Sequence, residues 1–183
     1  MRVVRKLIII LGSLFVICFT GIYLFQKSIS KELEKKSRNV ETAWNDFNSD
    51  LVIRDSLLKY IASTNLDSLN YFVEKSIFER TKKDNTLDLA FYEYKINEYI
   101  VAHFNKQKQL VEFNIRLSDD ISNYNNCTKE YNTYISIFPH FIIAKKYNYY
   151  KKKYFAITYG KENVDPMQKS KELPDWAKGV DTT

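Results

Sequence analysis

Residues 31–61 of the chain read KELEKKSRNVETAWNDFNSDLVIRDSLLKYI. Apolar side chains recur at alternating intervals of four and three residues, which is the spacing of one face of an α-helix. The positions of this stripe, seven of them apolar, are Leu33, Ser37, Val40, Trp44, Phe47, Leu51, Arg54, Leu58 and Ile61. At 1.5 Å per residue the helix is roughly 50 Å long. Its apolar face therefore needs a partner of similar length.

Upstream of this helix, residues 7–25 read LIIILGSLFVICFTGIYLF and contain no charged side chain. As a helix this run spans roughly 28 Å, about the thickness of the hydrocarbon core of a bilayer. No small-x-small cleavage site closes the run, and Ile17 rather than a small residue precedes Cys18. An uncleaved transmembrane anchor is therefore favoured over a cleaved or lipidated signal peptide. We predict a basic tail and anchor over residues 1–27.

Charge bears on orientation and on possible ligands. Arg2, Arg5 and Lys6 before the apolar run favour a cytoplasmic N-terminus, although five Lys and Arg residues also follow within ~15 residues. We predict a single-pass protein of the cell (inner) membrane with its domain on the non-cytoplasmic side. Of the formal net charge of +6, three charges precede the anchor, and the rest of the chain holds 25 basic against 22 acidic residues. Nucleic acid is therefore not a predicted partner.

Downstream, a second long stripe ends at Pro139, which stops a helix. Its positions are Leu110, Asn114, Leu117, Ile121, Tyr124, Thr128, Tyr131, Ile135 and Phe138. Two shorter helices are predicted between the long ones, with turns at Asn65 and over residues 82–86. The fold class is thus all-α: a transmembrane helix followed by an antiparallel four-helix bundle with two long and two shorter helices. The bundle covers residues 28–159, and residues 160–183 are a flexible polar tail.

The segment after Pro139 reads HFIIAKKYNYYKKKYF. In an up-down-up-down bundle the fourth helix returns toward the membrane, so this segment is predicted near the lipid surface. Lysine and tyrosine together suit the headgroup region, although a solvated, lysine-coated end of the bundle is an equal alternative. The candidate contact residues are Lys145, Lys146, Lys151, Lys152 and Lys153.

Several motifs in these helices resemble the LemA family of bacterial membrane-anchored helical proteins. Residues 39–46 read NVETAWND, and the pairs Tyr124-Asn125 and Tyr131-Asn132 precede Phe138-Pro139 in the family's YN…YN…FP pattern. The resemblance covers most of residues 1–157. The motif positions are Asn39, Trp44, Arg54, Tyr124, Asn125, Tyr131, Asn132, Phe138, Pro139, Ala144, Tyr154 and Phe155. The resemblance implies an N-terminal membrane helix and a four-helix antiparallel domain, and it supplies no defined molecular activity.

The chain also departs from the family pattern. The D-L-I-P-N-L-V run expected after Arg54 is replaced by residues 56–62, SLLKYIA, and a Y-P-x-L-K loop is missing. Asn114 and Ile121 stand where the family usually has Glu and Arg on its fourth helix. These differences indicate a divergent member.

Arg54 is the charged residue within the first apolar stripe. If it is buried it needs acceptors, because an unpaired buried charge is strongly destabilising. With Leu33 set against Phe138, the expected partners are Asn114 and Asp50. The alternative is that the side chain extends to the rim of the bundle and stays solvated.

The Tyr and Asn pairs recur one heptad apart. The structural interpretation is that each Tyr packs its ring in the core and finds an acceptor for its hydroxyl. The functional alternative makes the two Asn residues a ladder for the backbone of a partner.

The sequence contains no evident active site. His103 and His140 have no metal ligand or nucleophile at helical spacing, and neither HExxH nor GxSxG occurs. Asp119 and Asp120 are adjacent, so on a helix they point in different directions. We predict no catalytic, metal-binding or cofactor-binding residue, no cofactor and no small-molecule substrate.

The predicted function is a membrane-anchored helical interaction or scaffold protein with a protein partner in or at the membrane. Its candidate contact surfaces are the Lys/Tyr end and the middle segment with Tyr92, Tyr94 and Tyr99. The alternative is a helical bundle at the membrane surface that senses a lipid or small ligand in a pocket between helices.

Overall fold

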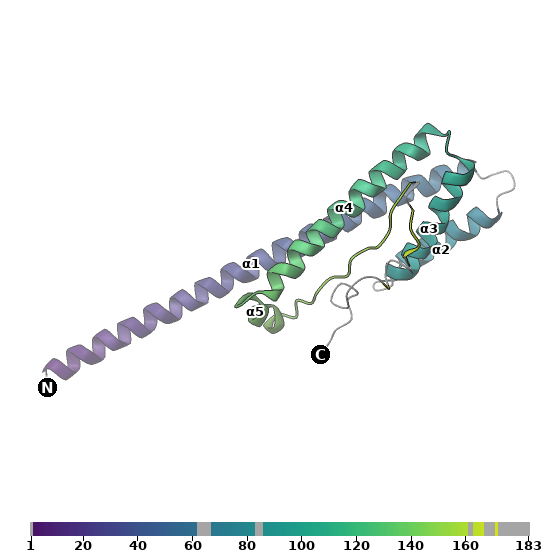
Figure 1. Ribbon diagram of the computed structural model, residues 1–183. Helices are drawn as coiled ribbons and strands as arrows, with labels where there is room; N and C mark the ends of the chain where they lie inside the picture. The colour runs from purple at the N-terminus through teal and green to yellow at the C-terminus, as the bar shows by residue number, and fades with distance from the viewer. Residues whose placement is uncertain (1, 62–66, 83–85, 161–162, 167–170, 172–183) are drawn as a thin grey trace.

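The computed structural model describes residues 2–61, 67–82, 86–160, 163–166 and 171. This part of the chain contains helices and no β-strand, which confirms the all-α prediction (Figure 1). The helices are α1 (Arg2–Ile61), α2 (Asp67–Arg80), α3 (Thr86–His103), α4 (Lys108–Ser136) and α5 (His140–Lys146). The predicted turn at Asn65, part of the turn over residues 82–86 and most of the predicted polar tail lie outside the described residues.

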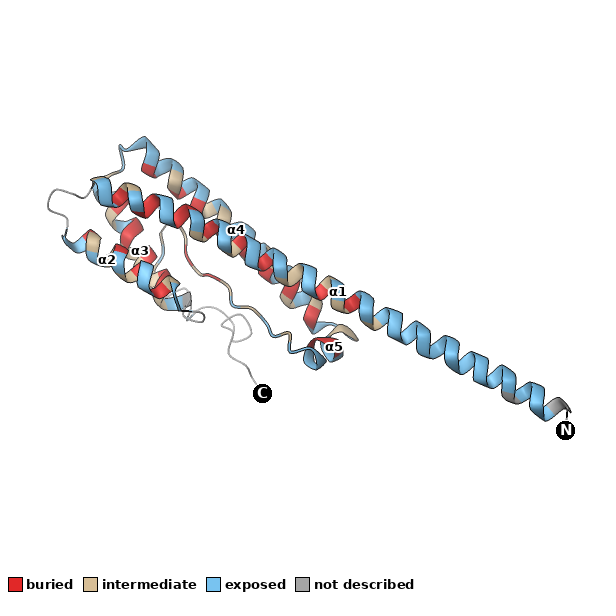
Figure 2. Ribbon diagram, turned by 180° about the vertical axis from the view of Figure 1, so that it is seen from behind, coloured by how far each residue is buried: buried red, intermediate tan, exposed pale blue. Residues whose placement is uncertain are grey.

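Helix α1 is continuous over 60 residues and has two different halves. Its N-terminal half contains the apolar run of residues 7–25, and the described side chains of that run are exposed (Figure 2). It is long and apolar enough to cross a membrane, and it fits the predicted membrane anchor. The side of the membrane on which the domain lies stays a prediction.

The C-terminal half of α1 packs antiparallel against α4 and forms a two-helix rod. Lys36 pairs with Glu130 at 3.3 Å, and Arg116 pairs with Asp50 at 2.5 Å. The residue numbers of both pairs add to 166, so the two helices keep one register between them. The core of the rod contains Leu33, Val40, Ala43, Phe47, Leu51, Leu117, Ile121, Tyr124, Tyr131 and Ile135. Each large apolar side chain buried here stabilises the rod by roughly 1.5–3 kcal/mol.

Helices α2 and α3 pack against each other and sit at the end of the rod that is distant from the apolar half of α1 (Figure 1). A second, smaller core joins them to the rod through Leu58, Leu69, Val73, Ile96, Ile100 and Leu110. A uniform antiparallel bundle of four helices is not confirmed. The physical reason is length, because helices of 14 and 18 residues reach only about 21 and 27 Å and cannot cover the rod.

The remaining length of the rod is covered by extended chain. After α5, residues 147–160, here called the strap, run back along α1 and α4 to reach α3 (Figure 1). On its inner face the strap buries Phe155, Ile157 and Tyr159. The Phe155 ring lies 5.4 Å from the rings of both Trp44 and Phe47. The spacing of two residues between the buried side chains of the strap is typical of an extended segment with one buried face. The sequence prediction did not use this signal, and it placed the segment that ends at Phe155 near the lipid surface.

Candidate functional site

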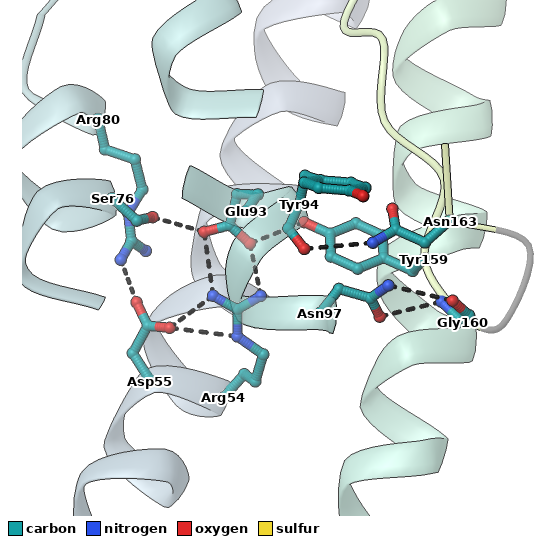
Figure 3. Close-up of polar contacts among 10 residues, drawn as sticks. All are labelled: Arg54, Asp55, Ser76, Arg80, Glu93, Tyr94, Asn97, Tyr159, Gly160 and Asn163. Atoms are coloured by element: carbon teal, nitrogen blue, oxygen red, sulfur yellow. Dashed lines mark hydrogen bonds and ion pairs between the residues drawn. The ribbon is translucent and has the colours of Figure 1, made fainter. Parts of the chain in front are cut away.

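Arg54 is fully buried where α1 meets α3 (Figure 3). Its Nη1 and Nη2 atoms donate to the two carboxylate oxygens of Glu93, at 2.5 and 3.0 Å. Its Nη2 and Nε atoms also donate to Oδ1 of Asp55, at 2.6 and 3.2 Å. Arg54 is buried because it lies on the apolar face of α1. The prediction that Asn114 and Asp50 are its partners was wrong.

The two expected partners are engaged elsewhere or unpaired. The rod register brings Asp50 to Arg116 of α4, so its carboxylate is not available to Arg54. Asn114 is buried, and its Oδ1 atom has no hydrogen-bond partner. The assumed packing of Leu33 against Phe138 was also wrong, because the observed register sets Leu33 level with position 133 and leaves Phe138 77% exposed.

The ionic cluster joins every element at the distal end of the rod. Glu93 of α3 also accepts hydrogen bonds from the hydroxyls of Ser76 at 2.5 Å and Tyr159 at 2.9 Å. Asp55 in turn is paired with Arg80 of α2. Two arginines and two carboxylates therefore balance each other, and they tie α1, α2, α3 and the strap together (Figure 3).

The electrostatics of this cluster keep Arg54, Glu93 and Tyr159 each in one protonation state. Burial opposes the charge on Arg54, but Glu93 and Asp55 outweigh it and raise the pKa of Arg54. Burial likewise opposes the charge on Glu93, and Arg54 outweighs it, so the pKa of Glu93 is lowered. Burial and the Glu93 carboxylate raise the pKa of Tyr159, so it stays a phenol that donates its proton in a hydrogen bond. Acid–base catalysis needs a group with a pKa near the working pH, and these shifts lead away from it. The shifts therefore favour a structural role for the cluster.

Sequence analysis did not find Glu93, although one signal was available. In α3 the buried residues Leu89, Ile96 and Ile100 form a helical stripe, and Glu93 occupies a position within it. An acidic residue inside one apolar stripe and a basic residue inside another are complementary, because each needs a buried opposite charge. That complementarity could have suggested the pair of Arg54 and Glu93.

Three asparagines hold the backbone of the strap. Asn132 donates to the carbonyl of Lys152 and accepts from its N–H, both at 2.8 Å. Asn125 binds Phe155 in the same two-point way at 3.0 and 2.9 Å, and Asn97 binds Gly160 at 3.1 and 3.0 Å. A carboxamide carries a donor and an acceptor side by side, so it satisfies both backbone groups of a residue that has no neighbouring strand.

Two tyrosines of α4 complete this ladder. The hydroxyl of Tyr124 donates to the carbonyl of Lys153 at 2.7 Å, and that of Tyr131 donates to the carbonyl of Tyr150 at 3.0 Å. Both rings are buried in the core of the rod. The tyrosines thus act as the structural interpretation expects. The asparagines do form a ladder for a backbone, and that backbone is the chain's own strap.

The other motif residues lie in varied surroundings. Trp44 is partly buried against the rings of Phe47, Tyr124 and Phe155, and Ala144 is buried in α5. Asn39 is exposed on α1, Pro139 is partly buried between α4 and α5, and Tyr154 is partly buried on the strap.

The five lysines of the predicted membrane contact are divided between two places. Lys145 and Lys146 are exposed on α5, and Lys151 and Lys153 are exposed on the strap. Lys152 is partly buried, and its Nζ atom pairs with Glu41 at 3.0 Å. These three strap lysines lie beside α1 well beyond the apolar half of the helix, because the strap runs away from that half. Contact of any of the five lysines with lipid stays a prediction.

A cleft of about 790 Å³ lies between α1, the strap, the end of α2 and the start of α3. Trp44 and Tyr124 supply aromatic surface. The charged side chains that line it are Glu41, Glu79, Arg80, Lys82, Lys151, Lys152 and Lys153. Both signs of charge are therefore present in the cleft.

An apolar N-terminal helix that is long enough to cross a membrane leads into a helical domain, and this architecture fits the class of membrane-anchored helical proteins. Within that class, the family model that matches is that of the LemA family, over residues 102–167. The match contains both Tyr-Asn pairs, α4, α5 and the strap, and it is consistent with a LemA family member. The family prediction is confirmed on this segment. No curated protein and no solved structure matches the chain.

Proposed function

We propose that this protein is a non-enzymatic membrane-anchored scaffold that binds a partner protein at the membrane. The observation that carries the proposal is the continuity of α1, which runs from Arg2 to Ile61 without a break. A continuous helix joins the anchor to the domain without a flexible linker. From Phe25 to Leu58 it extends about 50 Å. The α2–α3 pair is thereby held at a set distance from the end of the apolar run.

The internal use of the buried charges supports a structural role for them. Arg54, Glu93 and Asp55 are directed at one another, and their charges serve to join α1, α2 and α3. We propose that a surface beside this cluster, rather than its buried charges, makes the functional contact. Its presentation on the non-cytoplasmic side of the inner membrane is part of the proposal.

The most suitable surface for a partner lies between α1 and α2. Val52 and Ile77 are 58% and 37% exposed there, and Phe78, the next residue along α2, is 56% exposed. Val52 and Ile77 line a groove of about 440 Å³, together with Asp55 and Arg80. Clustered exposed apolar side chains with polar neighbours are typical of protein-binding surfaces. The tyrosines expected in this role are less available, since Tyr92, Tyr94 and Tyr99 are all partly buried.

The test is purification of the tagged full-length protein from native membranes in mild detergent, beside the variants Phe78→Glu and Ile115→Glu. Ile115 is a matched control, because it is 59% exposed on α4, outside the groove. We expect one stoichiometric partner that is lost with Phe78→Glu and retained with Ile115→Glu. Retention in both variants, or the absence of any stoichiometric partner, would contradict the proposal.

A second candidate is supported by the 790 Å³ cleft, which is large enough for a small ligand with an aromatic part. In this hypothesis Trp44 stacks on the ligand and the strap lysines bind an acidic group. Native mass spectrometry of the full-length protein distinguishes the two functions. A bound small molecule that is lost with Trp44→Ala would favour ligand sensing, whereas a protein partner lost with Phe78→Glu favours the scaffold.

A further inference from the structure

The corner between α4 and α5 carries an unusual group of exposed apolar side chains. Ile137, Phe138, Phe141 and Ile142 are 47%, 77%, 48% and 51% exposed, and together they are here called the apolar corner. The rings of Phe138 and Phe141 lie 6.3 Å apart, so the group is contiguous. Contiguous apolar surface of this kind marks contact with another apolar phase or with a protein.

The register of the rod places the apolar corner near the end of the apolar run. The pairs Lys36–Glu130 and Asp50–Arg116 define that register. It sets Ser136, the last residue of α4, level with Ser30, five residues beyond Phe25. That difference is about 7.5 Å along the helix axis, and Ile137 and Phe138 follow Ser136 directly. The apolar corner therefore lies close to the point along α1 where the hydrocarbon core of a bilayer spanned by residues 7–25 ends.

Packing against α1 keeps the corner at this height. Ile143 and Ala144 of α5 belong to the same core as Ile29 and Leu33 of α1. Because these residues face inward, the neighbouring Phe141 and Ile142 face outward. Figure 1 shows α5 beside α1 at the end of α4 that points toward the N-terminal half of α1.

The charged surroundings of the corner match a lipid headgroup layer. Lys145 and Lys146 are exposed at the end of α5, and Lys27 and Lys31 are exposed on α1 at nearby heights. Tyr147, 48% exposed, follows directly. Apolar side chains flanked by Lys and Tyr are typical of segments that lie in the interface of an anionic bilayer.

We propose that the apolar corner is a second membrane-contact site, which inserts Phe138 and Phe141 into the interfacial region of an anionic bilayer. The occupant is lipid rather than another protein, because the spanning helix holds the corner at the bilayer surface. Two contacts, the anchor and the corner, set the direction in which the rod leaves the membrane. The site shares Lys145 and Lys146 with the lysine contact that the sequence predicted, but its inserted residues are aromatic, and Lys151–Lys153 lie farther along the rod. It rests on α1 spanning the membrane, and it is independent of the partner in the proposed function.

The experiment uses the full-length protein with Cys18→Ser and Cys127→Ser, reconstituted in vesicles of phosphatidylcholine and phosphatidylglycerol. A nitrobenzoxadiazole label is attached at Phe138→Cys, or at the matched apolar control Ile115→Cys. Ile115 is exposed on α4 and lies level with residue 51, about 39 Å from Phe25. Lipids with a nitroxide near the headgroup should quench the label at position 138 at least several-fold more than the label at position 115.

Two further samples make each outcome decisive. A protein that retains Cys18 as its labelled position reports on the anchor, and it should be quenched by nitroxides deep in the acyl chains. Phe141→Glu, added to the Phe138→Cys protein, should reduce quenching toward the level of position 115, whereas Glu added at Ile115 should not. The proposal is overturned if positions 138 and 115 are quenched alike while Cys18 is quenched. It is equally overturned if Cys18 is not quenched, because the anchor then fails too. Circular dichroism confirms that each variant is helical.

Discussion

The rod and the distal junction are built on the same helix but are held by different forces. Along the rod, α1 and α4 bury aliphatic and aromatic side chains, and neutral amides hold the strap. At the junction, α1 meets α2 and α3 through the buried cluster of Arg54, Glu93 and Asp55. Apolar packing is non-directional and tolerates small shifts, whereas a two-point ion pair requires one geometry. The difference suggests that the rod supplies stability and that the cluster supplies the position of the α2–α3 pair.

The largest expected effect comes from breaking the cluster with Glu93→Ala. The change leaves Arg54 buried with only Asp55, and removal of one member of a buried pair lowers the free energy of unfolding by about 3–5 kcal/mol. Urea unfolding of the full-length protein in detergent, followed by circular dichroism, measures it. The control is Glu98→Ala on the same helix, whose exposed pair with Lys95 should contribute less than about 1 kcal/mol. Equal effects of the two changes would contradict the assignment.

The pH dependence of stability should then separate the junction from the rod. Because the pKa of Glu93 is lowered in the folded protein, its stabilisation is present above the pKa of an unfolded Glu. It is lost as the pH falls through the lower, folded value. In the Glu93→Ala variant, the free energy of unfolding should therefore fall less steeply with decreasing pH than in the unchanged protein.

In the rod, Phe47→Ala should lower the free energy of unfolding by about 3 kcal/mol, through lost burial and a cavity. The rings of Trp44 and Phe155 lie 5.5 and 5.4 Å away and can close part of that cavity. This variant should keep the acid dependence of the unchanged protein, since no charge is altered. If Phe47→Ala changed the dependence of the free energy of unfolding on acidic pH, the stabilities of the rod and of the junction would not be separate.

A smaller and more local effect is expected from Asn132→Ala. It removes two hydrogen bonds to Lys152, for a loss of about 1–3 kcal/mol. The strap should open without unfolding of the rod. Hydrogen exchange should therefore become faster at the backbone amides of Lys152 and its neighbours and stay unchanged in α1. Asn126→Ala, at an exposed position of the same helix, is the control and should leave exchange unchanged.

The smallest effect concerns Asp120 in the rod. Burial and the nearby carboxylate of Asp50 raise the pKa of Asp120 to about 6. At a pH between the pKa of Asp120 in the unfolded protein and its folded pKa, the folded protein binds more protons than the unfolded protein. The contribution of Asp120 to the free energy of unfolding therefore falls as the pH rises through that window. Asp120→Asn should remove this dependence and increase stability at pH 7.5 by less than about 1 kcal/mol, because solvent screens the site. Asp119→Asn, its exposed neighbour, should change neither property in thermal unfolding at pH 4.5 and 7.5.

Local patterns were sufficient for the helices but not for their partners. The stripe of α4 predicted the buried positions Leu117, Tyr124 and Tyr131, because periodicity alone decides which face of a helix is apolar. Phe138 has the same spacing but is exposed, since the helix ends at Ser136 before this position reaches a partner. The alternating residues of the strap were also missed, because a short extended run has no sheet to join and resembles loop.

The sequence by itself determined the apolar N-terminal helix, the all-α class, the two long stripes and the motifs that match the LemA family. These features depend on residues within a few turns of one another, where the geometry of a helix is sufficient. Only the tertiary structure decided that Arg54 is neutralised by Glu93, that the strap replaces the missing length of helix, and that Phe138 faces outward beside α1. Each of these three features depends on the register between segments that are far apart in the chain. That register is set by all the packing contacts together.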